Sequence, residues 1–341
     1  MTDVSVPRTG MWLPTWGLVT TRLLELRKRR GLMIAVAVLM LALPVLVLGL
    51  RLIFHAADPK TYGPAGSPGI FGGIVNTMAE FGFIAAATLG TAAGTTDLTD
   101  GMFRHLVVTG RSRLALYLAR IPAGLAILLP ALALAFSAVC LVTSYAGVPQ
   151  PTSISVGGVP VPPGLGQAGL GTWERAHPQQ AATAFGPQQS MGSDYDQYAS
   201  AELSGENPAV NEMVKIGLWL VLDVGVAFTV GLGLGSLIGQ RTVSTILMIA
   251  LVIIVTPILA DHVIPYFIDG QRLDVGIALD QLRPAGLASG TGDAGGPRIL
   301  FGGHGVLQIP PMPTWGMISV VVGWIVGWTG IGAWRMATRD A

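Results

Sequence analysis

Long apolar runs separated by shorter polar segments dominate this chain. Six runs reach the length of about 20 residues that an α-helix needs to cross the hydrocarbon core of a bilayer. They cover residues 32–54, 69–94, 117–145, 213–239, 243–267 and 315–334. Only 11% of the 341 residues are charged, against about 25% in soluble domains. The pattern therefore predicts an all-α polytopic membrane protein with six transmembrane helices.

Two polar segments between these runs are long, and both are rich in glycine and proline. They cover residues 146–212 and 268–314. Neither carries a sustained period, so we expect irregular structure, with room for a short helix over 199–212. A tolerated surface insertion and a lid over a substrate path are the two interpretations. The chain thus divides into an N-terminal segment, 1–31, and a membrane domain, 32–341.

The distribution of basic residues predicts the orientation of the chain. If the N-terminus is cytoplasmic, most of the 20 Lys and Arg residues lie in short segments on the cytoplasmic side, as the positive-inside rule requires. The others are spread over the much longer outer segments, which also hold most of the carboxylates. We therefore expect a multi-pass protein of the cell (cytoplasmic) membrane, with both termini in the cytoplasm and membrane lipid around its spans.

The residues before the first span predict an amphipathic helix. Apolar side chains recur at spacings of three and four, which places them on one helical face: Trp12, Trp16, Val19, Leu23 and Leu26. Polar side chains lie away from that face: Thr21, Arg22, Glu25 and Lys28. Tryptophans opposite a basic end are typical of a helix that lies in the headgroup region. The alternative is a cytosolic helix packed against a partner.

A charged segment between the second and third spans predicts a short cytoplasmic helix. Asp97 and Asp100 stand at its expected start, where the helix dipole stabilises carboxylates. Arg104 follows Asp100 by four residues and can pair with it. Gly110 is a poor helix former and ends the helix before the third span. The alternative is an ordinary positive-inside loop without a partner.

This segment resembles the cytoplasmic loop of the ABC type-2 transporter permeases, the membrane subunits of a class of ATP-driven exporters. Their loop runs acidic–x–x–x–Gly–Thr, then a basic residue and leucines, then Pro–x–Ser–Arg into the third span. The matching positions here are Asp97, Gly101, Leu106, Ser112 and Arg113. Met102 replaces the family's threonine, and Gly110 replaces its proline. The six-span layout and the leading helix also agree with the family, whereas the outer segment 146–212 is longer than usual.

The resemblance implies a permease that pairs with a second permease chain, identical or different, and with two cytoplasmic ABC ATPase subunits. The loop helix is then expected to dock in a groove of the ATPase. The residues expected to carry this coupling are Asp97, Asp100, Gly101, Arg104, Leu106, Ser112 and Arg113. ATP and Mg would bind to the partner ATPase, because this chain has no phosphate-binding G-x-x-x-x-G-K motif. We expect no cofactor in the chain itself.

Polar side chains also fall inside the predicted spans: Asn76 and Glu80 in the second and Asp223 in the fourth. A charge at membrane depth costs roughly 2.5–3.5 kcal/mol on insertion scales. No arginine or lysine falls at a matching depth along the sequence, so we expect each carboxylate to be protonated or hydrogen-bonded. A structural hydrogen bond between helices is one interpretation, and contact with substrate or protons is the other.

Other functions explain fewer of these features. A proton-coupled secondary transporter could use Glu80 and Asp223, and a membrane scaffold would transport nothing, but neither needs a docking loop. A net charge of +1 offers no basic surface for nucleic acid. The single cysteine, Cys140, excludes an intramolecular disulfide, and the five His residues are too sparse for a metal site. No catalytic motif lies at membrane depth, so we do not expect an enzyme.

Overall fold

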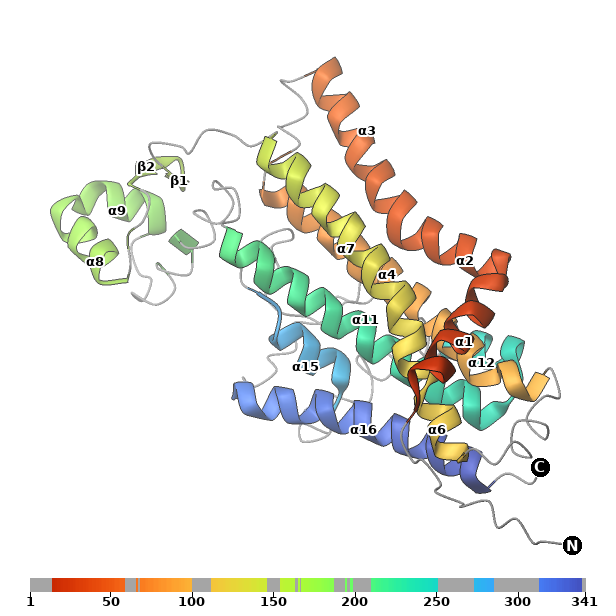
Figure 1. Ribbon diagram of the computed structural model, residues 1–341. Coiled ribbons are helices and arrows are strands. Elements are labelled where there is room, and N and C mark those ends of the chain that lie inside the picture. The colour runs from red at the N-terminus through yellow and green to blue at the C-terminus, as the bar shows by residue number, and fades with distance from the viewer. Residues whose placement is uncertain are drawn as a thin grey trace, which may run out of the picture.

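A computed structural model of the chain describes residues 14–58, 66, 68–99, 112–145, 154–162, 165, 167–186, 194, 197–198, 210–250, 273–284 and 313–338. Within these residues the protein is mostly helical, with one small β-hairpin. Figure 1 shows long tilted helices gathered into a bundle, with a group of short elements beside it. We call this group, formed by the described residues between 154 and 198, the lobe.

Five helical segments of the described residues are long and apolar enough to cross a membrane. They cover Arg30–Ala57, Ile70–Thr96, Arg113–Tyr145, Val210–Ile238 and Thr314–Thr338. Five of the predicted spans are therefore confirmed as helices of spanning length. The remaining one, 243–267, begins within α12 (Arg241–Ala250), and its residues beyond 250 lie outside the described part of the chain. The six-span layout thus stays a prediction.

Prolines mark the places where two spanning segments depart from a regular α-helix. The first segment consists of three consecutive elements: α2 (Arg30–Ala37), the π-helical turn η1 (Val38–Ala42) and α3 (Leu43–Ala57). Pro44 has no N–H for the carbonyl one turn earlier, which accounts for the π-helical turn before it. The third segment consists of two elements: α6 (Arg113–Leu118) and α7 (Arg120–Tyr145). Pro122 follows the break between them.

Two helices form the centre of the bundle: α4 (Pro68–Thr99) and α11 (Val210–Ile238). They run parallel and touch through glycine. A Cβ at Gly94 would lie 2.6 Å from the Leu232 carbonyl oxygen, and one at Gly235 would lie 2.6 Å from that of Thr91. Small residues recur at every fourth position of both helices, at 82, 86, 90 and 94 and at 231 and 235. This spacing predicts close packing against a neighbouring helix, and in the structure the two helices are each other's neighbour. We call this contact the α4–α11 seam.

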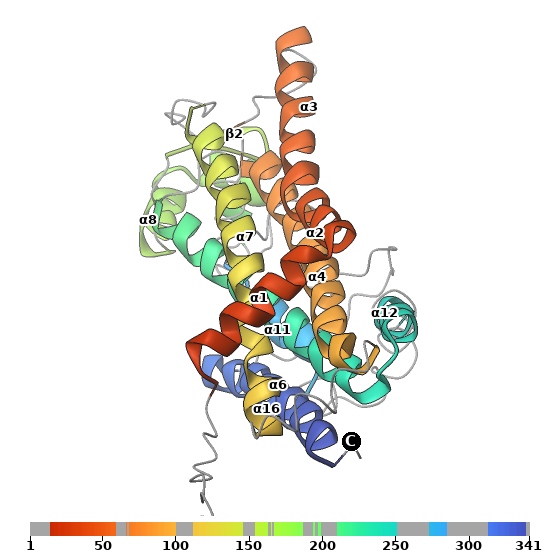
Figure 2. The ribbon, with the colours of Figure 1, turned by 45° about the vertical axis from the view of Figure 1, so that its right-hand side comes forward.

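The bundle has two ends that differ in their surroundings. At the loop end, α4 finishes and α6 begins, so this end borders the predicted coupling loop. At the lobe end, α7 finishes and α11 begins. Three further helices complete the bundle: α1 (Trp16–Lys28), α15 (Val275–Gln281) and α16 (Thr314–Thr338). Figure 2 shows α1 lying across α7, and Figure 1 shows α15 against α11 and α16.

Several helices expose large apolar side chains along the outside of the bundle. Examples from α3 are Leu46 and Ile53, and examples from α16 are Val326 and Trp334. Lipid tails suit such a surface and water does not. The long apolar helices and this outer surface together identify a mostly helical membrane protein.

The lobe has a small core of its own, which the sequence analysis does not predict. Its hairpin pairs β1 (Ile154–Val156) with β2 (Val159–Val161), and Gly157 and Gly158 make the turn with positive φ. Two short helices follow: α8 (Gln167–Ala176) and α9 (Pro178–Phe185). Buried side chains join these elements: Val156, Val161, Leu170, Phe185 and Tyr198. The prediction of irregular structure is therefore wrong for this part of segment 146–212, which adds a small hairpin and two short helices to the mostly helical chain.

Candidate functional site

The loop end carries the segment that the sequence singles out for coupling. α4 continues to Thr99, so Asp97 lies in the last turn of this helix and does not begin a new one, which corrects its expected placement. The Thr96 hydroxyl bonds back to the Ala92 carbonyl oxygen at 2.7 Å, within the continuing helix. Four predicted coupling residues lie outside the described part of the chain: Asp100, Gly101, Arg104 and Leu106. The docking helix therefore stays a prediction.

The two predicted coupling residues that follow the loop have local partners. Ser112 caps α6, because its Oγ accepts a hydrogen bond from the Ala115 backbone N–H at 3.2 Å. Arg113 Nη1 donates to the Ala337 carbonyl oxygen, in the last turn of α16, at 2.9 Å. The C-terminus of a helix carries partial negative charge, which suits a guanidinium. The start of the third span is thus attached to the end of α16.

Arg120 joins the two spanning segments on either side of the loop. Its side chain comes from the first turn of α7 and is only 2% exposed. Nη1 donates to the Gly94 carbonyl oxygen of α4 at 3.1 Å. A buried guanidinium is tolerated only where its N–H groups find acceptors. α4 and α7 are therefore tied together close to the loop, which α4 borders directly and from which α7 is separated by the short helix α6.

Helix α1 packs on the same region from the side. Its buried residues are Val19, Arg22 and Leu26, and Val19 packs with Ala119 of the third span. Trp16 is expected on the face of Val19, but it is 79% exposed. Arg22 is expected on the polar face, but it is buried. The packed face of α1 is thus rotated from the predicted one, because α1 packs on this chain's own helices; its place in the headgroup region stays a prediction.

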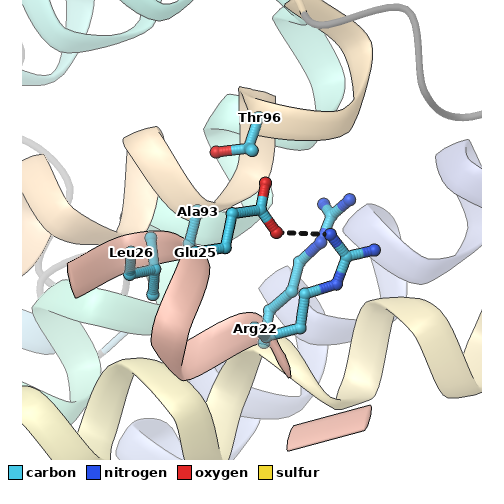
Figure 3. A pocket seen from close by; sticks show the side chains of 6 residues that line it. Arg22, Glu25, Leu26, Ala93 and Thr96 are labelled. Carbon is cyan, nitrogen blue, oxygen red and sulfur yellow. Dashed lines mark hydrogen bonds and ion pairs between the residues drawn. The ribbon is translucent and has the colours of Figure 1, made fainter. Parts of the chain in front are cut away.

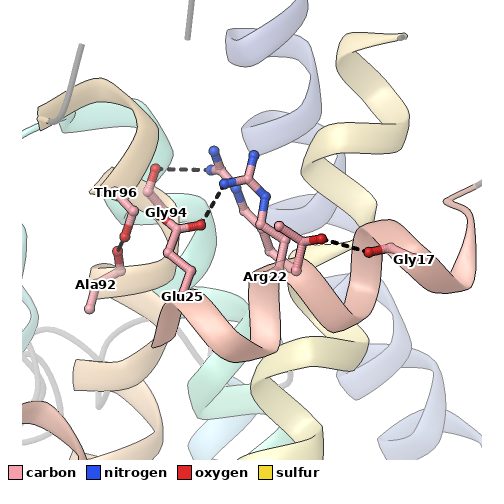
Figure 4. A network of polar contacts seen from close by, with 8 residues as sticks. Gly17, Arg22, Glu25, Ala92, Gly94 and Thr96 are labelled. Atoms are coloured by element: carbon pink, nitrogen blue, oxygen red, sulfur yellow. Dashed lines mark hydrogen bonds and ion pairs between the residues drawn. The ribbon is translucent and has the colours of Figure 1, made fainter. Parts of the chain in front are cut away.

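Arg22 and Glu25 bring an ion pair into this contact. Arg22 Nη1 lies 2.8 Å from Glu25 Oε2. Both side chains line a narrow cavity between α1, α4 and α7, shown in Figure 3. We call the polar residues that meet here the three-helix junction: Arg22 and Glu25 of α1, Gly94 and Thr96 of α4, and Arg120 of α7. The junction lies directly beside the end of α4 from which the loop leaves (Figure 4).

A second polar cluster lies toward the lobe end of α4 and involves α11. Arg283 follows α15 in the outer segment 268–314, and its Nη2 donates to Oδ1 of Asn76 on α4. Its Cζ lies 5.9 Å from the ring centroid of Trp219 on α11, which is a cation–π distance. A basic residue from a distant segment of the sequence thus reaches Asn76, one of the predicted intramembrane polar residues.

The other two predicted intramembrane residues lie close to this contact along the chain. Glu80 is half-buried and follows Asn76 by about one turn of α4. Asp223 is 8% exposed and follows Trp219 by about one turn of α11. Arg283 thus contacts both Asn76 of α4 and Trp219 of α11. Glu80 follows Asn76, and Asp223 follows Trp219, each about one turn closer to the loop end.

Sequence reasoning assigned no role to Arg120 or Arg283, although each has a detectable signal. Arg120 stands at the edge of an apolar run, and Arg283 follows the short apolar stretch of α15 in segment 268–314. The chain matches none of the protein-family models and none of the curated proteins with which it was compared. Its function must therefore follow from its own residues, above all from the loop pattern and the three-helix junction.

Proposed function

We propose that this chain is the permease subunit of an ATP-driven exporter of the ABC type-2 class, and that the 97–113 loop couples it to a separate cytoplasmic ATPase. Five apolar helices of spanning length support a membrane body, and the acidic-to-Ser-Arg pattern of the loop supports docking. The observation that carries the proposal is the attachment of this loop. It is bounded on both sides by helices that the Arg120–Gly94 contact ties together.

The three-helix junction offers a path along which force could pass. A displacement of the loop would be transmitted to α4 at Asp97 and to α6 at Ser112. Because Arg120 holds the Gly94 carbonyl, α4 and α7 would move as a unit at this end, and α1 would follow them. The α4–α11 seam then passes the motion to α11, since backbones in contact cannot slide freely. In this scheme ATP and Mg bind to the ATPase, and a second permease chain completes the transport path.

A proton-coupled secondary transporter that uses Glu80 and Asp223 is the competing function. The burial of Asp223 favours it, because carboxylates inside a membrane are costly and commonly functional. Such a carrier needs neither the loop pattern nor an ATPase. Variants of the loop therefore separate the two functions, since they should disable an exporter and leave a proton-coupled carrier intact.

The first test identifies the partner. The tagged full-length chain is extracted from its own membranes in mild detergent, and every co-purifying chain is identified by mass spectrometry. We expect an ATPase that carries the phosphate-binding motif missing here. Asp97→Lys and Gly101→Leu should lower its recovery at least about tenfold, as loss of a central interface residue does, with unchanged abundance in the membrane.

The matched control is Asp58→Lys, at the end of α3 and at the lobe end of the bundle. It makes the same charge change as Asp97→Lys and should leave the ATPase bound. A wild-type complex without any ATPase contradicts the proposal. So does full recovery of the ATPase with both loop variants.

A further inference from the structure

Arg283 enters the bundle from a segment that two tryptophans hold in place. Trp219 Nε1 of α11 donates to the Leu279 carbonyl oxygen at 2.8 Å, and Trp324 Nε1 of α16 donates to that of Leu273 at 2.8 Å. Leu279 itself is buried among apolar side chains of α11 and α16. α15 is therefore attached at both of its ends, and the arginine just after it reaches a defined position.

The guanidinium of Arg283 meets two groups that bind cations. Nη2 donates to Oδ1 of Asn76, and Cζ lies 5.9 Å from the ring centroid of Trp219. An amide oxygen accepts an N–H from any donor, and an indole face attracts any cation placed over it. Neither group requires an arginine. Another cation of similar size in this position would find the same partners.

The α4–α11 seam fixes which residues of the two helices lie level with each other. A Cβ at Gly82 would lie 3.4 Å from Val224 Cγ2, and one at Gly235 would lie 2.6 Å from the Thr91 carbonyl oxygen. The two pairs are separated by nearly the same number of residues on each helix. Because the helices run parallel, one register therefore holds along more than two turns.

Continued toward the lobe end, this register sets Glu80 level with Asp223 and Asn76 level with Trp219. The second pair is the one that Arg283 bridges, which agrees with the register. A helical turn rises about 5.4 Å, so the backbone positions of Glu80 and Asp223 lie roughly one turn along their helices from those of Asn76 and Trp219, the two partners of Arg283. Opposite charges attract strongly over such a distance where the surroundings are apolar.

We propose that four residues form a subsite for the cationic head of an amphiphilic cargo, and that Arg283 fills it while no cargo is bound. We call them the cation subsite: Asn76, Glu80, Trp219 and Asp223. The carboxylates attract a guanidinium or ammonium head, the amide accepts its N–H, and the indole covers its face. The part played in transport rests on the proposed exporter function, whereas binding of a cation does not.

A permanent structural ion cluster would use the same contacts but respond differently to loss of the arginine. If Arg283 only stabilises the fold, its removal lowers the thermal stability of the protein, and no free cation selectively restores that stability. If Arg283 occupies a site made for another cation, its removal opens a space of guanidinium size. A free guanidinium with an apolar tail should then bind there more tightly than to the intact protein.

The experiment measures binding of n-octylguanidinium to the full-length protein in lipid nanodiscs, by calorimetric titration and by the midpoint of thermal unfolding. Arg283→Ala should bind this probe at least about tenfold more tightly than wild type, and the probe should restore its unfolding midpoint. n-Octyl sulfate has the same tail and the opposite charge, and it should do neither. Arg51→Ala removes an exposed arginine of α3 and should behave as wild type.

Further variants test whether the gain in n-octylguanidinium binding depends on the residues of the cation subsite. Asp223→Asn added to Arg283→Ala should abolish the gain, whereas Glu212→Gln added in the same way should preserve it, because Glu212 lies on α11 outside the subsite. Arg283→Gln guards against a misfolded alanine variant, since it keeps a donor for Asn76 and removes the charge. No gain in either Arg283 variant, or a gain that survives Asp223→Asn, overturns the cation subsite.

The two proposals can fail separately. If the protein binds n-octylguanidinium selectively but has no ATPase partner, the exporter proposal is contradicted and the cation subsite is supported. If the protein binds an ATPase but its Arg283 variants bind n-octylguanidinium no better than wild type, the cation subsite is contradicted and the exporter proposal is supported.

Discussion

α4 meets an arginine near each of its ends, and the two contacts differ in kind. At the loop end, the buried Arg120 donates to the backbone carbonyl of Gly94. At the lobe end, the half-buried Arg283 donates to the side-chain amide of Asn76, beside the ring of Trp219. A backbone carbonyl is present whatever the side chains are, so the first contact suits a joint. The second depends on side chains that suit a cation, so it can serve recognition.

The two arginines also belong to different kinds of segment. Arg120 is part of a spanning helix, and it cannot withdraw unless α7 moves with it. Arg283 follows a helix of seven residues, α15, whose described hydrogen bonds to the spans come from two tryptophans. Segments held by few buried contacts open at lower free-energy cost than a bundle core. We therefore expect the loop end to transmit motion between helices. At the lobe end we expect a ligand to displace Arg283.

This comparison requires α4 to behave as one rigid element between its ends, and Gly90→Leu is the change that disturbs it most. A Cβ at Gly90 would meet the Phe228 carbonyl oxygen and would lie 2.8 Å from the Leu232 backbone nitrogen. The backbones of α4 and α11 must then separate. We expect a loss of about 3 kcal/mol of stability, seen as a lower unfolding midpoint and a smaller monodisperse peak in size-exclusion chromatography.

Gly323→Leu is the matched control for this prediction. A Cβ at Gly323 of α16 meets nothing within 4 Å, so the larger side chain should project from the bundle without strain. Its unfolding midpoint should stay close to that of wild type. A wild-type midpoint for Gly90→Leu would show that the seam can open, and α4 could then not link the two ends.

Arg120→Gln tests the loop end as a joint. The shorter side chain removes the guanidinium that bonds Gly94, and a buried group left without its partner costs about 1–3 kcal/mol. ATPase recovery should persist because the loop is unchanged, while transport should fall because α4 and α7 no longer move together. Arg27→Gln, an exposed position of α1, is the control and should change neither. Full transport by Arg120→Gln would contradict the joint.

The spans could be predicted because hydropathy sums along a segment and needs no knowledge of partners. The predicted span 213–239, for example, is observed as Val210–Ile238. Glycine spacing likewise predicted that α4 and α11 each pack closely on a neighbouring helix, although it did not identify the neighbour. The side of α4 that meets α11 also contains a polar residue, since Thr91 packs directly on Gly235. A helix inside a bundle has neighbours on several sides, and one sequence does not show where they lie.

Contacts between distant segments could not be predicted from local patterns. Arg283 and Asn76 are 207 residues apart, and no period of the sequence connects them. Arg22 is buried because other helices cover it, although its position in α1 suggests an exposed face. The lobe core draws single apolar residues from a chain rich in glycine and proline. These contacts make up much of the candidate site, which is why its residues were harder to identify than the fold.

Trp219→Phe examines the attachment of α15 at the lobe end, with a smaller expected effect. Phenylalanine keeps an aromatic face beside Arg283 and loses the 2.8 Å hydrogen bond to Leu279, which should cost about 1 kcal/mol. The amides of residues 275–281 should then exchange faster in hydrogen–deuterium exchange. Trp315→Phe, at a 74% exposed position, should leave their exchange unchanged. Unchanged exchange in Trp219→Phe would show that α15 is attached by other contacts.

The smallest effect is expected in the lobe, where it concerns pH. Burial, with the Asp194 carboxylate as the second cause, raises the pKa of Glu174 above its ordinary value of 4.5. Its Oε1 is enclosed and accepts no hydrogen bond from the described residues. The folded state thus holds the proton more tightly than the unfolded chain does. The contribution of Glu174 to stability should therefore be most favourable below pH 4.5 and should become less favourable as the pH rises through the raised pKa.

Glu174→Gln keeps the shape of the side chain and removes this dependence on pH. At about pH 7.5, where Glu174 is charged, the variant should be more stable than wild type. At about pH 4, where Glu174 is protonated, the two proteins should be equally stable. Thermal unfolding of the full-length protein at the two pH values measures the difference, and Glu212→Gln on α11 is the control. An equal shift at both pH values would contradict the assignment, because a side chain that only fills space does not respond to protons.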